Sequence, residues 1–94
     1  MVTQLDYNRL EKMIDELESL GYTVSSVRQS TLLPSTGKVY KRRFDVRDSE
    51  NTWVAVIYIS DQRQEAVGGV TNIAERFVSE SVSEIERVLS RYSL

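Results

Sequence analysis

Residues 52–60 read TWVAVIYIS, a run that is apolar at every position between its two polar ends. Its β-branched and aromatic side chains predict a strand. Because successive side chains of a strand point to opposite faces, Trp53, Ala55, Ile57 and Ile59 share one face and Val54, Val56 and Tyr58 the other. Both faces are apolar, so this strand needs cover on both sides.

The segment KVYKRRFDVR at residues 38–47 alternates between two kinds of side chain and predicts a preceding strand. The core-facing set is Tyr40, Arg42, Phe44 and Val46, and the solvent-facing set is Lys41, Arg43, Asp45 and Arg47. DSEN at residues 48–51 is a turn of the length that joins hairpin strands. An irregular first strand follows Gly21, and TLLPSTG at residues 31–37 connects it to the second.

Two helices flank these strands. Apolar residues three and four apart predict a helix over about residues 4–20, with a Thr3–Asp6 capping box and Gly21 as its left-handed C-terminal cap. Residues 61–69 form a polar connection that ends in a glycine pair. A second helix is expected over about residues 71–92, with Asn72 and Glu75 as its capping box.

The element order α-β-β-β-α predicts an α+β fold in a single domain, residues 1–94. We expect a three-stranded antiparallel meander in the order one-two-three, with both helices packed on one face. The third strand is then a sheet edge, and the competing explanation is that it lies at the centre of the sheet or that the connection at residues 31–37 folds over it. The expected core includes Leu17, Phe44, Ile57, Phe77 and Ile85.

Composition restricts the chemistry. The chain has no histidine and no cysteine, which removes thiolate and imidazole metal ligands and the usual nucleophile–base pairs. We therefore expect no enzyme activity, no cofactor and no metal. The lack of cysteine and of a signal-like or membrane-spanning apolar run predicts a cytoplasmic location without membrane contact.

Charge is distributed unevenly. Residues 28–47 carry six basic side chains and one acid, a net charge of +5, whereas residues 1–27 carry −3 and residues 48–94 carry −4. A basic surface of this kind suits nucleic-acid phosphates, and its candidate residues are Lys38, Lys41, Arg43 and Arg47. The aromatic residues of the same strand point to the opposite face, so stacking partners for bases are missing there.

The favoured function is a non-enzymatic protein-interaction or regulatory module that acts as a homodimer or as part of a complex. An open, apolar third strand invites pairing with a second copy. Leu32 and Leu33 lie in a connection where polar residues are usual, so they either cover the sheet or await a partner. The expected partner interface is Leu32, Leu33, Val54, Val56 and Tyr58. Nucleic-acid binding through residues 38–47 is the alternative, and a small enzyme without histidine or cysteine chemistry is third.

Overall fold

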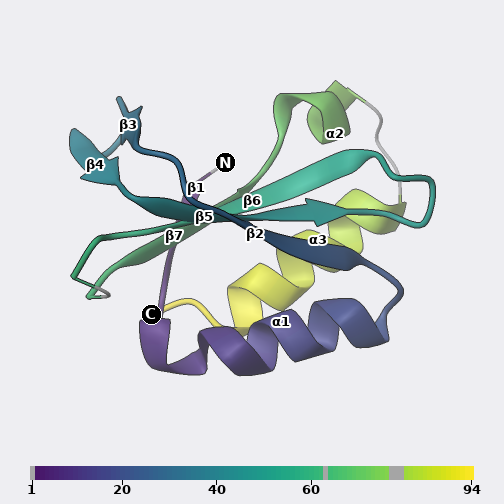
Figure 1. Cartoon of the computed structure of the whole chain (residues 1–94). Coiled ribbons are helices and arrows are strands. Elements are labelled where there is room, and N and C mark those ends of the chain that lie inside the picture. Colours follow the sequence, from purple (N-terminus) through teal and green to yellow (C-terminus); the bar gives the residue numbers. More distant parts are fainter. Residues whose placement is uncertain (1, 63, 77–79) are drawn as a thin grey trace.

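Five antiparallel strands form the main sheet of the computed structural model, which describes residues 2–62, 64–76 and 80–94 (Figure 1). In spatial order they are β1 (Val2–Leu5), β7 (Ala66–Val70), β6 (Trp53–Ile59), β5 (Arg42–Arg47) and β2 (Thr23–Val27). A separate hairpin pairs β3 (Thr31–Leu33) with β4 (Lys38–Tyr40). The helical elements are the short 3-10 helix η1 (Tyr7–Arg9), α1 (Leu10–Ser19), α2 (Asn72–Arg76) and α3 (Glu80–Arg91). The predicted α+β class is confirmed.

β6 is the central strand of the sheet, so the prediction that residues 52–60 form an edge is wrong. The three expected strands correspond to β2, β5 and β6 and lie side by side in the predicted order. β7 pairs with the other side of β6, and β1 pairs with β7. The three-stranded meander therefore underestimates the sheet by two strands.

Both additional strands lack the alternation that marks a half-buried strand. Every residue of β7 is buried, and β7 contains the glycine pair that resembles a connection. A Cβ atom at Gly68 would lie 2.7 Å from Leu5 Cδ1 and 3.1 Å from Leu89 Cδ2. Glycine at this position lets β1 and α3 approach β7 closely, which is a packing role rather than a turn.

α1 and α3 lie together on one face of the sheet, called the helix face below (Figure 1). Leu17, Ile57 and Ile85 are fully buried in the core, as predicted. Phe44 is half-buried and packs against this core, and Phe77 lies outside the described residues. Within the described part of the chain, no helix has the length and apolar character needed to cross a bilayer.

The first helix ends as predicted but begins later. Gly21 has a φ of +96°, and the Tyr22 N–H donates to the Leu17 carbonyl over 3.1 Å, which closes a Schellman cap. The helix does not begin near residue 4, because that segment is β1. The Asp6 side chain instead accepts from the Asn8 N–H over 3.0 Å and caps η1, so the Thr3–Asp6 capping box is wrong.

The second predicted helix is divided into α2 and α3, with residues 77–79 outside the described part. Its first cap is Thr71 rather than Asn72. The Thr71 hydroxyl accepts from the Ala74 N–H over 3.2 Å and donates to the Trp53 carbonyl over 2.8 Å. Thr71 thus starts α2 and fixes it to the beginning of β6.

Tyr22, which follows α1, connects this end of α1 to the first turns of α3. Its side chain is buried, and its hydroxyl donates to Glu84 Oε2 over 3.0 Å, with the Ser81 carbonyl at 3.2 Å. Burial, together with the hydrogen bond and the negative charge of Glu84, raises the pKa of the Tyr22 hydroxyl above its ordinary value of 10.0. The protonated phenol is therefore the form that the fold stabilises.

Tyr22→Phe should lower the free energy of unfolding by about 1 kcal/mol at pH 7, because this hydrogen bond is lost. A pKa raised on folding gives a contribution that is present below pH 10 and is lost as the pH rises through the folded-state pKa. The wild-type protein should therefore lose stability more steeply than the variant above about pH 10. Urea unfolding of both proteins from pH 7 to 11 measures this difference, and parallel curves would contradict it.

Candidate functional site

The β3–β4 hairpin forms a small sheet of its own beside the main sheet, on the side away from α1 (Figure 1). The predicted connection at residues 31–37 contains β3 and the hairpin turn. At the end of that turn the Gly37 N–H donates to the Leu33 carbonyl over 2.8 Å. Gly37 has a φ of +69°, a left-handed conformation that glycine adopts without steric cost. The hairpin is thus set by local turn chemistry.

The inner face of the hairpin is anchored to the sheet. Tyr40 is 1% exposed, and its ring centroid lies 6.0 Å from that of Tyr58 on β6. Lys38 Nζ lies 2.6 Å from Glu65 Oε1, next to β7, and this hydrogen bond raises the pKa of Lys38. Two residues of β4 therefore connect the hairpin to the sheet, the buried Tyr40 and the exposed Lys38.

The alternation of residues 38–47 predicts that Tyr40 faces the same way as Phe44 and Val46. In the structure Tyr40 faces the opposite way. The strand is interrupted at Lys41, between β4 and β5. Tyr40 consequently packs on Tyr58, whose cross-strand partner is Arg43 on the face opposite Phe44. The interruption moves Tyr40 to the outer face of the sheet, where it helps to cover β6.

The other face of the hairpin is exposed and apolar. Leu32 and Val39 are direct cross-strand partners, so their side chains lie on one face. Leu32 is 62% exposed and Val39 is 50% exposed. We call this pair the hairpin surface.

The five residues of the predicted partner interface do not form one surface. Leu32 belongs to the hairpin surface, whereas Leu33 is half-buried on the inner side of the hairpin. Val56 and Tyr58 are half-buried on the outer face of the sheet. Val54 is 4% exposed and belongs to the core, so it has no surface to offer a partner.

A β-bulge explains the position of Val54. Arg47 pairs with Trp53, which leaves Val54 as the additional residue on β6. Because cross-strand partners share a face, Trp53 lies on the outer face, where the Arg43 guanidinium carbon is 5.8 Å from the ring centroid. The predicted grouping of Trp53 with the core face and Val54 with the opposite face is wrong, since the extra residue shifts the alternation.

Three of the four residues proposed for nucleic-acid contact already have protein partners. Lys38 pairs with Glu65, and Arg43 Nε lies 2.9 Å from Asp45 Oδ1. Arg47 donates to the Asn51 carbonyl over 3.4 Å. Lys41 lies apart from these residues at the rim of a pocket. The basic strand therefore does not present a continuous row of available cations.

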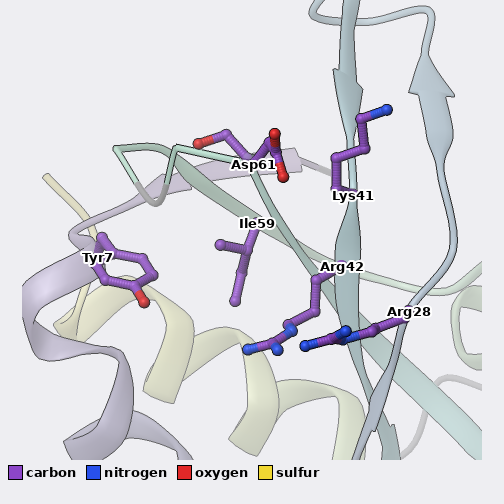
Figure 2. A pocket seen from close by; sticks show the side chains of 7 residues that line it. Tyr7, Arg28, Lys41, Arg42, Ile59 and Asp61 are labelled. Atoms are coloured by element: carbon purple, nitrogen blue, oxygen red, sulfur yellow. The ribbon is translucent and has the colours of Figure 1, made fainter.

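That pocket, called the arginine pocket below, has a volume of about 280 Å³ (Figure 2). It is lined by Tyr7, Arg28, Lys41, Arg42, Ile59, Ser60 and Asp61. Figure 2 shows the guanidinium groups of Arg28 and Arg42 at the same end of the pocket. Tyr7 lies on the other side of Ile59, and Lys41 points away from both arginines. Among the described residues, no acid forms an ion pair with either arginine.

Sequence reasoning missed this pocket. One signal was present, because Arg42 falls among core-facing residues of the alternating strand, an unusual place for a charge. Arg28 carries no local signal, since its place in the same pocket as Arg42 depends on the pairing of β2 with β5. No group of three or more acidic side chains within the described residues is placed to hold a metal ion.

No protein-family model, curated protein or solved structure matches this chain. Its function therefore has to be inferred from the hairpin surface and the arginine pocket themselves.

Tyr40→Ala should lower the free energy of unfolding by about 3 kcal/mol, because a fully buried aromatic side chain is removed from the contact with Tyr58. Val39→Ala, one residue earlier in the same strand, should cost less than about 1 kcal/mol because the side chain is half exposed. Chemical denaturation of both variants tests whether one face of the hairpin is buried and the other is exposed. Equal losses would contradict the assignment of its inner and outer faces.

Proposed function

We propose that this chain is a non-enzymatic protein-interaction or regulatory module that acts as a homodimer or as part of a complex. The observation that carries this proposal is the exposed Leu32–Val39 pair on a hairpin whose Tyr40 is buried against Tyr58. The proposal includes a cytoplasmic location, which suits a chain without cysteine.

A pair of large apolar side chains held side by side is a natural contact point for another protein. Single exposed apolar residues are common on protein surfaces, but Leu32 and Val39 are adjacent and stand on a projecting element. The buried Tyr40 ring, packed on Tyr58, orders β4 before binding, so less conformational entropy is lost when a partner docks. The hairpin surface thus meets two requirements of an interaction site.

The interface differs from the one that an edge strand would give. β6 is paired on both sides, so strand addition to β6 is not part of the proposal. The partner instead contacts side chains of the hairpin surface. Leu32 is retained from the residues predicted for the interface, and Val39 is added to it.

A photo-crosslinking amino acid at position 39 tests the proposal directly. When it replaces Val39, ultraviolet light should produce a discrete protein adduct in extracts of the source cells. The same amino acid in place of Glu86, an exposed residue of α3, should give no such adduct. Adducts of equal yield at both positions, or at neither, would contradict the hairpin surface as the contact site.

The double variant Leu32→Lys with Val39→Lys should abolish the adduct-forming complex and leave the fold intact, because both side chains are exposed. Sedimentation at about 100 μM, well above micromolar dissociation constants, distinguishes a homodimer from a complex with another protein. A wild-type dimer that the double variant also forms would place self-association elsewhere on the molecule.

A further inference from the structure

The arginine pocket brings two like charges together, the guanidinium groups of Arg28 and Arg42 (Figure 2). The pairing of β2 with β5 ends at Val27 opposite Arg43, and Arg28 and Arg42 are the next residues outward along the chain. Bringing two like charges close together costs free energy, which an opposite charge between them offsets. An anion between them would remove this cost.

The protein itself supplies no such anion among the described residues. Asp61 lines the same pocket, but in Figure 2 its carboxylate lies on the side of Lys41, away from the guanidinium groups. Glu11 lines a neighbouring cavity that shares Arg42, without forming an ion pair with it. The two arginines therefore keep their hydrogen-bond donors available for a ligand.

We propose that Arg28 and Arg42 bind the phosphoryl group of a phosphate monoester. Such a group carries a charge of about −1.5 to −2 at pH 7 and three acceptor oxygens, which matches two guanidinium groups in charge and donor geometry. Tyr7 lines the same pocket and offers a hydroxyl as a further donor. The volume of about 280 Å³ accommodates a group of this size.

The surroundings of the pair favour one phosphoryl group over a polymer of phosphates. Asp61 and Glu11 line the arginine pocket and its neighbour, so the adjacent phosphates of a nucleic-acid strand would meet carboxylates. These acids repel extended polyanions more than a single compact group. The ligand is accordingly a small molecule that carries one phosphoryl group.

The organic part of the ligand has a place beside the arginines. A second cavity of about 390 Å³ shares Tyr7, Arg42 and Ile59 with the arginine pocket. Its remaining lining includes the apolar side chains of Leu10, Ile14 and Phe44. An apolar group attached to the phosphate would lie along this second cavity, which separates an ester from free inorganic phosphate.

Titration of the folded protein with inorganic phosphate, followed by backbone amide chemical shifts, tests the site. Phosphate should shift the amides around Arg28 and Arg42, and sodium chloride at the same ionic strength should not. Phenyl phosphate should bind several-fold more tightly than inorganic phosphate, and acetate more weakly. Equal affinity for phosphate and phenyl phosphate would overturn the ester assignment, and equal affinity for acetate would overturn the phosphoryl assignment.

Arg28→Gln and Arg42→Gln should each weaken phenyl phosphate binding by about tenfold or more, because a charge-assisted hydrogen bond is lost. Arg42→Lys keeps the charge and should give a smaller loss. The matched control is Arg87→Gln, which removes the same charge from an exposed position on α3 and should leave the affinity unchanged. If Arg87→Gln weakens binding as much as Arg28→Gln does, the loss of affinity comes from the change in net charge, and the proposed site is wrong. The test does not involve Leu32 or Val39, so its outcome is independent of the hairpin surface.

Discussion

Covering the apolar strand β6 on all sides is the constraint on which the rest of this structure depends. β5 and β7 form hydrogen bonds with the two sides of β6, so no row of backbone N–H and C=O groups along β6 is left unpaired. The helices cover one face around Ile57. On the other face Tyr40 packs on Tyr58, and Trp53 and Arg43 lie together further along the sheet. A strand with two apolar faces thus becomes the centre of a small domain.

The same constraint moves the candidate contacts away from β6. The hairpin that carries Tyr40 onto the outer face has a second side, and that side exposes Leu32 and Val39. The arginine pocket lies where β2 leads into the hairpin and β5 begins, lined by Arg28 and Arg42. Both candidate sites therefore involve the end of the main sheet from which the hairpin extends.

Local patterns were sufficient for much of the fold. The apolar stripe of α1, the glycine cap at Gly21 and the three strands β2, β5 and β6 could all be predicted, because each depends on neighbouring residues. β1 and β7 could not, since their pairing joins residues far apart in sequence and Gly68 has a packing role. At the sites, Leu32 was visible as an apolar residue in a connection. The placement of Arg28 and Arg42 in one pocket required the strand register, which no local pattern contains.

Native-state hydrogen exchange tests the central position of β6 most directly. If β6 is paired on both sides, all amides from residues 55–59 should exchange only through global unfolding. The edge strand β2 should show fast exchange at alternate amides, which provides an internal comparison. Fast exchange at every second amide of β6 would show an open edge there, and would contradict the arrangement from which the hairpin surface and the arginine pocket are inferred.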